Sequence, residues 1–116
     1  DESIIYYHSH WELAEDEALV IEVLPPVCDM WNFQLNNYWM ESLDYRYFNI
    51  SINKISAHYE ADGSVKVFIA HTDPGHPNWL NTCHHREGTM CWRWYRLAEG
   101  MKPLEPACRV IHMNYY

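Results

Sequence analysis

The 116-residue sequence has little positive charge, and this scarcity excludes several functions. Eight lysine and arginine residues stand against sixteen aspartate and glutamate residues, which gives a formal net charge of −8 at pH 7. The basic residues are scattered, and Arg93 and Arg96 come closest to forming a pair. Contacts with phosphate groups need concentrated positive charge. We therefore expect no binding to nucleic acid or to anionic membranes.

Long apolar runs and targeting segments are missing as well. The longest apolar run, around Ala18 to Leu24, is interrupted by Glu22 and is too short to span a membrane. No signal-peptide pattern, internal repeat or interdomain linker is visible. Because the sequence begins at Asp1 rather than at methionine, we expect a single domain over residues 1–116 that is a fragment or processed part of a longer chain.

Apolar residues make up 48% of the chain and aromatic residues 16%, so large side chains for a core are plentiful. They alternate with polar residues in several short runs, as expected for strands with one buried face. Pro25-Pro26 ends the first run. The inward-facing positions that this pattern predicts are Leu19, Ile21 and Val23, then Trp31, Phe33 and Leu35, and finally Met90, Trp92 and Trp94.

A hairpin is predicted around Asp62-Gly63, a pair that tolerates the positive φ of a tight turn. Its first strand would contain Ile55, Ala57 and Tyr59 and its second Val65, Val67 and Ile69, with a bulge near Asn53-Lys54. Helical signals are limited to single turns at residues 11–18 and 37–43. The sequence therefore predicts an all-β fold, an antiparallel β-sandwich of jelly-roll type with at most short helical turns.

Three blocks of sequence carry a family resemblance. They are WELAEDEALVIEVLPP (residues 11–26), WNFQLNNYWMESLDY (residues 31–45), and DGSVKVFIAHTDPGHPNWL with HREGTMCWRW (within residues 62–94). In this order they resemble the bacterial family called domain of unknown function 1214. The resemblance implies a jelly-roll sandwich that commonly forms the C-terminal part of a longer protein. It implies no activity, because the family has none established.

The richest group of polar side chains lies between residues 71 and 85. His71, Asp73 and His76 are side chains of the types that bind zinc or another divalent transition metal. Their spacing matches no established motif, and Asp73 among prolines is also typical of a capped, stiff turn. A metal-assisted enzyme using the His71–His85 loops is therefore an alternative reading, with His71 or His85 as general base and Asp73 or Glu87 orienting it. No nucleophile-elbow pattern supports it.

Four cysteines, Cys28, Cys83, Cys91 and Cys108, are disulfide candidates, and the sequence does not choose among their three full pairings. Cys83 with Cys91 across a turn would leave Cys28 with Cys108, whereas four buried thiols would suit a cytoplasmic protein. Asn49 begins an Asn-Ile-Ser glycosylation sequon. Together the even cysteine count and the sequon favour a secreted or extracellular glycoprotein, with a cytoplasmic location as the alternative.

The aromatic surplus favours core burial first and a binding surface second. Trp79, directly after the proline-rich turn, is the candidate for stacking on a glycan or a partner; Tyr38, Trp39 and the Tyr6-Tyr7 pair are others. With no catalytic motif and no cofactor firmly implied, we expect a non-enzymatic sandwich that binds a protein partner or self-associates. A metal-assisted enzyme and a glycan-binding module are the alternatives.

Overall fold

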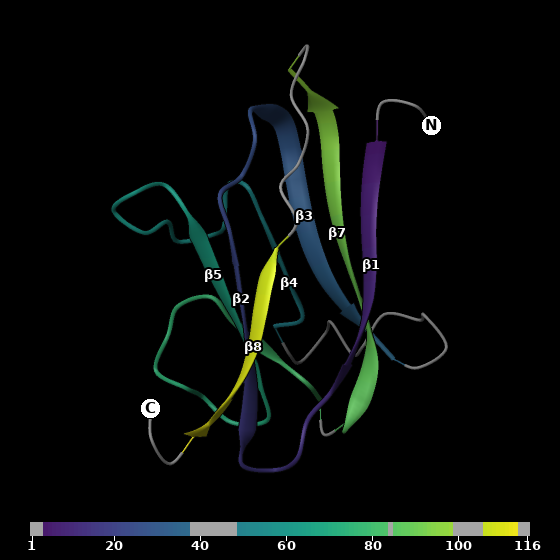
Figure 1. Ribbon diagram of the computed structural model, residues 1–116, viewed down its shortest axis with the longest axis vertical. Helices are drawn as coiled ribbons and strands as arrows, with labels where there is room; N and C mark the ends of the chain where they lie inside the picture. The colour runs from purple at the N-terminus through teal and green to yellow at the C-terminus, as the bar shows by residue number, and fades with distance from the viewer. Residues whose placement is uncertain (1–3, 38–48, 84, 99–105, 114–116) are drawn as a thin grey trace.

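The computed structural model describes residues 4–37, 49–83, 85–98 and 106–113, which form two β-sheets packed face to face (Figure 1). One sheet has the strand order β1-β7-β3-β4 and the other the order β6-β5-β2-β8. The strands are β1 (Ile4–Glu12), β2 (Glu17–Val23), β3 (Cys28–Asn36), β4 (Ser51–Asn53), β5 (Val65–Ala70), β6 (Trp79–Asn81), β7 (Glu87–Leu97) and β8 (Ala107–His112).

The core forms where the alternating sequence patterns place their apolar faces. Strand β7 lies at the centre of its sheet, and Trp92 stands opposite Phe33 of β3 while Trp94 stands opposite Trp31. The rings of Trp31 and Trp92 have centroids 5.1 Å apart, and those of Phe33 and Trp92 are 5.0 Å apart. Leu19, Ile21 and Val23 of β2 belong to the same buried cluster. The inward faces predicted for β2, β3 and β7 are thus confirmed.

The all-β sandwich is confirmed, with one departure from a wholly antiparallel arrangement. Strand β6 pairs with β5 in parallel, through Phe68 opposite Trp79, whereas all other ladders are antiparallel. The specific jelly-roll topology stays a prediction. The described ranges contain no α-helix, and hence none that is long and apolar enough to cross a membrane. Residues 15–16 form a turn, while most of the predicted helical turn at residues 37–43 lies outside the described residues.

The predicted hairpin is only half right. Gly63 has a φ of 86° and closes a tight turn in which Glu60 N donates to Ser64 O at 2.8 Å. Residues 54–60, however, form no strand. Asn53 ends β4 because its side-chain oxygen accepts hydrogen bonds from the backbone of Ile55 and of Ser56, which turns the chain out of the sheet. The predicted bulge is therefore a turn.

The outer strands β1 and β8 leave one side of the sandwich open. They belong to different sheets, and each is the edge of its own. Ile5 lies opposite Trp94 and Val110 lies opposite Leu19, so both share the inward-facing side of their strands. Both are nevertheless exposed, by 39% and 50%. The two sheets therefore do not close over each other along this side.

Candidate functional site

His71 is a structural bridge in the position where the sequence suggested a ligand or a base. Its Nδ1 lies 2.6 Å from the hydroxyl of Thr82, and its Nε2 lies 3.1 Å from the carbonyl oxygen of Leu13. A carbonyl only accepts, so Nε2 carries the proton donated to Leu13, and in the neutral ring Nδ1 accepts from Thr82. Both ring nitrogens are therefore occupied in joining three segments of the fold.

The other two predicted metal ligands do not converge on His71. Asp73 accepts a hydrogen bond from Gly75 N at 2.7 Å, which is the turn-capping role. His76 stacks on Phe68 with ring centroids 4.5 Å apart, and its Nδ1 accepts from Asn78 N at 3.0 Å. No three potential ligand side chains gather anywhere in the described part of the chain. Turn geometry uses the polar atoms of Asp73 and His76, so they do not form a site with His71 in this arrangement, and the metal site stays a prediction.

The acid–base pairs proposed for an enzyme are not assembled either. A carboxylate oxygen of Glu87 lies 3.7 Å from Nε2 of His10, on the neighbouring strand, where both side chains are exposed. His85 makes a backbone hydrogen bond, in which its N–H donates to Thr82 O at 3.0 Å. His71 and His85 thus show no carboxylate partner in the described residues, and the geometry gives the enzyme alternative no support.

Asn78 and Trp79 fasten the loop that precedes β6. Asn78 is only 1% exposed; its Oδ1 accepts from His58 N, and its Nδ2 donates to His58 O and Lys66 O. The indole N–H of Trp79 donates to Ala70 O at 3.0 Å, and the side chain is half-buried. The Trp79 ring is therefore only partly exposed, and its role in stacking on a glycan stays a prediction. Tyr38 and Trp39 lie outside the described residues.

Asn49, the first residue of the sequon, is exposed and lies beside β6. Its Nδ2 donates to Trp79 O at 2.9 Å, and its carbonyl accepts from Asn81 N at 2.7 Å. Glycosylation and secretion stay predictions, and an attached sugar would replace one of the two protons on an amide that now supports this contact.

The four cysteines are thiols, and no two of them are joined in a disulfide. The suggested bonds between Cys83 and Cys91 and between Cys28 and Cys108 are thus not formed. Cys28 begins β3, and Cys108 lies on β8 in the opposite sheet, where it is exposed. Burial raises the pKa of both Cys28 and Cys91. Stability comes from the aromatic core without covalent links.

The outward face of the sheet formed by β1, β7, β3 and β4 carries polar side chains that bind one another. Asn32 donates to the Tyr95 hydroxyl at 3.3 Å and accepts from Arg93 at 3.3 Å. The Arg93 guanidinium lies 5.8 Å from the ring centroid of Tyr6, which in turn stacks on His8. Tyr6 therefore faces outward, whereas Tyr7 packs against the core. The sequence suggested this pair as one platform, but alternation along β1 separates them.

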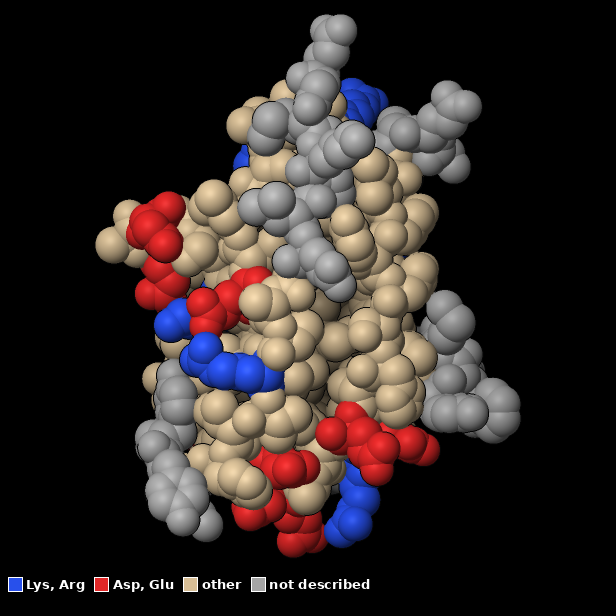
Figure 2. Space-filling view, viewed as in Figure 1, with Lys and Arg blue, Asp and Glu red and all other residues tan. Residues whose placement is uncertain are grey.

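Charged side chains are dispersed and paired. Arg109 lies 2.9 Å from Glu22, Arg96 lies 3.5 Å from Asp29, and Arg86 lies 3.7 Å from Glu15. Figure 2 shows acidic side chains at the lower end and on the left of this face, a mixed acidic and basic group left of centre, and a largely uncharged surface at the centre and right. Surface pairs of this kind contribute little to stability.

One end of the sandwich exposes a group of apolar side chains, which we call the apolar end: Leu24, Val27, Ile55 and Tyr59, with the half-buried Pro25 beside them. Val27 is 67% exposed, Ile55 is 81% exposed and Leu24 is 51% exposed. A shallow depression of about 340 Å³ opens there, with Pro25, Pro26, Val27 and Tyr59 among its lining residues. The backbone beneath is held in place, because Lys54 Nζ donates to Cys28 O at 2.7 Å and the Tyr59 hydroxyl donates to Lys54 O at 2.7 Å.

These features define a class: a two-sheet β-sandwich domain with a buried aromatic core, an open side and an apolar end. The model of the family described as "Protein of unknown function (DUF1214)" matches residues 14–99. The chain belongs to this family, as its three sequence blocks predicted. The family description names no activity.

Two solved structures are similar to the chain. An uncharacterised protein from Burkholderia cenocepacia is 56% identical with a TM-score of 0.93; the match covers 100% of this chain and 32% of that one. The VPA0106 protein from Vibrio parahaemolyticus is 13% identical with a TM-score of 0.73; the match covers 94% of this chain and 31% of that one, and it shows the fold alone. The chain thus spans about a third of either relative. No curated protein matches it.

Proposed function

We propose that this domain is a non-enzymatic binding module whose apolar end docks onto a neighbouring domain of a longer protein. The observation that carries the proposal is the exposure of Val27 and Ile55, at 67% and 81%, on adjoining loops. Burying a side chain of this size releases roughly 1.5–3 kcal/mol. A contiguous exposed apolar patch is typical of an interaction surface rather than of open solvent contact.

The apolar end is also organised as a binding surface. Asn53 caps the turn that presents Ile55, and Lys54 bridges this turn to the start of β3. Trp31 lies under Tyr59 in an edge-on contact, with ring centroids 6.4 Å apart. Because the loops are already fixed by these contacts, binding would lose little conformational entropy.

The occupant we propose follows from the relatives. Both solved relatives are about three times as long as the matched region, so in each of them a domain of this kind is accompanied by further polypeptide. The apolar end lies where β3 begins and β7 ends, the same end of the sandwich at which β1 starts (Figure 1). A neighbouring domain attached near β1 would therefore lie within reach of this surface.

The test uses the part of the Burkholderia relative outside the matched region, expressed as a separate protein. We expect it to bind the 116-residue chain in isothermal titration calorimetry. Val27→Lys and Ile55→Lys should each raise the dissociation constant at least about tenfold. Each removes buried apolar area and places an ammonium group in the interface. Val110→Lys is the matched control, because Val110 is 50% exposed on a different face.

Two results would contradict the proposal. One is a loss of binding in Val110→Lys as large as in the two variants of the apolar end. The other is the formation of dimers by the isolated chain, detected by light scattering and abolished by Ile55→Lys, which would make a second copy of the chain the occupant.

A further inference from the structure

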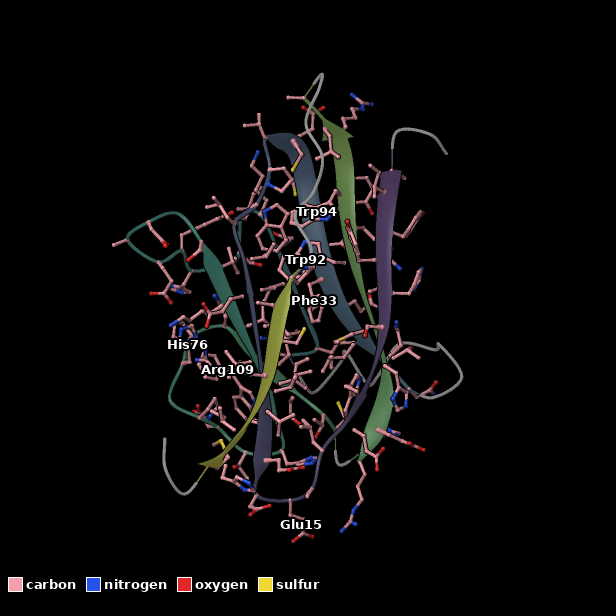
Figure 3. The ribbon with its side chains drawn as sticks, viewed as in Figure 1. Glu15, Phe33, His76, Trp92, Trp94 and Arg109 are labelled. Carbon is pink, nitrogen blue, oxygen red and sulfur yellow. The ribbon has the colours of Figure 1, made fainter. Side chains whose placement is uncertain are left out.

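Among the described residues that line the depression at the apolar end, only Lys54 has a charged side chain. Lys54 is exposed, and its Nζ donates to the carbonyl oxygen of Cys28, another lining residue, at 2.7 Å. Its backbone N–H donates to Trp31 O, and its carbonyl accepts from the Tyr59 hydroxyl. The Trp31 ring lies 6.1 Å from that of Trp94, the uppermost of the three core rings labelled in Figure 3. A positive charge therefore has a fixed place beside exposed apolar side chains.

In the described part of the chain, the ammonium group of Lys54 has no carboxylate partner. Three arginines each lie 2.9–3.7 Å from a carboxylate: Arg86, Arg96 and Arg109. Arg93 lacks such a partner too, but it lies on the outward face of its sheet, where it donates to Asn32. An ammonium group has three N–H donors, and Lys54 uses one of them on Cys28 O. With sixteen acidic residues against eight basic ones, a lysine without a carboxylate partner is unexpected.

The acidic side chains that follow or precede the lining residues along the chain are engaged elsewhere. Asp29 lies 3.5 Å from Arg96. Asp62 accepts hydrogen bonds from the backbone N–H and the hydroxyl of Ser64. Neither carboxylate forms an ion pair with Lys54. The place beside the ammonium group is therefore left for a carboxylate of a binding partner.

We propose that the segment docking onto the apolar end carries an aspartate or glutamate flanked by apolar side chains, and that its carboxylate pairs with Lys54 Nζ. This inference rests on the docking function proposed above and specifies the chemistry of the partner. The flanking side chains would cover Val27 and Ile55 and keep water from the ion pair, and the attraction between charges strengthens as water is excluded. A partner without the acid would leave the ammonium group buried and unpaired, which disfavours that partner.

Two small probes of matched shape test the pairing on the 116-residue chain itself: 3-phenylpropionate and its uncharged amide, 3-phenylpropionamide. Each has an apolar ring for the depression, and only the first has a carboxylate. In ¹H–¹⁵N spectra at pH 7 we expect both probes to move the amide signals of Val27, Cys28 and Ile55 saturably. The carboxylate should bind about threefold to fivefold more tightly. The net charge of −8 opposes the binding of an anion in general, so this preference reports a local cation.

The variants separate the charge of Lys54 from its contact with the Cys28 carbonyl. Lys54→Gln removes the charge and should make the two probes bind equally, whereas Lys54→Arg keeps the charge and should retain the preference for the carboxylate. Lys66→Gln is the matched control, because it makes the same change in net charge at a lysine that stands opposite Glu22 in the β2–β5 ladder. In this control the preference should persist. Thermal melting checks that each variant is folded.

The unmodified chain gives a second measurement that needs no variant. Its preference for the carboxylate should fall as NaCl is raised from about 0.05 M to about 0.5 M, because salt screens the attraction between the two charges. Equal binding of the two probes, a preference that survives in Lys54→Gln, or a preference that salt does not change would overturn the pairing. Absence of saturable binding by either probe would overturn it as well.

The docking function is judged separately, by the titration with part of the Burkholderia relative. In that titration Lys54→Gln should raise the dissociation constant at least about threefold. Binding that is lost in Ile55→Lys but unchanged in Lys54→Gln would overturn the role of Lys54 and leave the docking function standing. A preference for the carboxylate probe without any docking would refute the docking function and keep a carboxylate site at Lys54.

Discussion

Replacing His71 with alanine tests whether this histidine is a structural bridge or a functional ligand. The substitution removes the contacts with the Thr82 hydroxyl and the Leu13 carbonyl. Thr82 is 0% exposed and Leu13 is 2% exposed, so water has little access to the groups left behind. An unsatisfied buried polar group costs about 1–3 kcal/mol. We therefore expect the free energy of unfolding to fall by about 2–4 kcal/mol.

The measurement is urea unfolding at neutral pH, supported by thermal melting. For a domain of this size, each 1 kcal/mol lost from the free energy of unfolding lowers Tm by roughly 4 °C. The Tm of His71→Ala should therefore be about 8–16 °C lower than that of the unmodified protein. Combined with Thr82→Val, the two changes should be non-additive by about 1 kcal/mol, because both remove the same hydrogen bond. Asp73→Ala, which alters an exposed turn nearby, should cost less than about 1 kcal/mol.

The metal hypothesis makes the opposite prediction for the same variants. If His71 and Asp73 held zinc together, added zinc would raise the Tm of the unmodified protein and would lose this effect equally in both variants. A stability loss below about 0.5 kcal/mol in His71→Ala, or a zinc effect shared by the two variants, would refute the bridging role.

Two further predictions concern the strands around the core. Gly88→Ala should destabilise by at least about 3 kcal/mol in urea unfolding, because an added Cβ would overlap the Asn36 carbonyl and lie 2.8 Å from the Trp11 ring; a smaller loss would show that β3 yields easily. Burial raises the pKa of the Cys91 thiol above its ordinary value of 9.0, against a weaker opposing effect of Arg93. Burial favours the neutral thiol in the folded state, so the contribution of Cys91 to the free energy of unfolding is full below pH 9 and is lost as the pH rises through the raised pKa. In Cys91→Ala the free energy of unfolding should therefore fall less steeply at alkaline pH. An unchanged dependence on pH would contradict this.

The sequence predicted those parts of the fold in which one face of a strand is strongly apolar. Trp92 and Trp94 alternate with polar residues, so their inward direction follows from the period-2 geometry of a strand. Strand β8 has no such contrast: Val110 is apolar, yet it lies at an exposed edge. The pattern around Ile55 also suggested a strand, but Asn53 uses its side chain to cap a turn, and this local hydrogen bonding prevails over the apolar alternation.

For the candidate sites, the sequence shows which side chains are chemically suitable, but not which groups they contact in the fold. His71 and Asp73 are chemically suitable ligands, but only three-dimensional structure reveals that Leu13, 58 residues away, receives the proton of the His71 ring. The exposed loop residues Val27 and Ile55 carry no signal in a sequence where apolar residues are expected to be buried. Trp92 was correctly expected in the core, but its unpaired indole N–H depends on the packing of both sheets.

The position of β7 between β1 and β3 has a consequence for how the protein emerges from the ribosome. Ile4 pairs with Tyr95 and Glu12 pairs with Glu87, so the first strand has no sheet partner until the seventh has been made. At about 5–20 residues per second this interval lasts roughly ten seconds, during which β1 and β3 lack the central strand that joins them. Any truncation before residue 87 therefore removes the centre of one sheet and leaves β1 and β3 as unpaired edges, which are prone to associate with other chains.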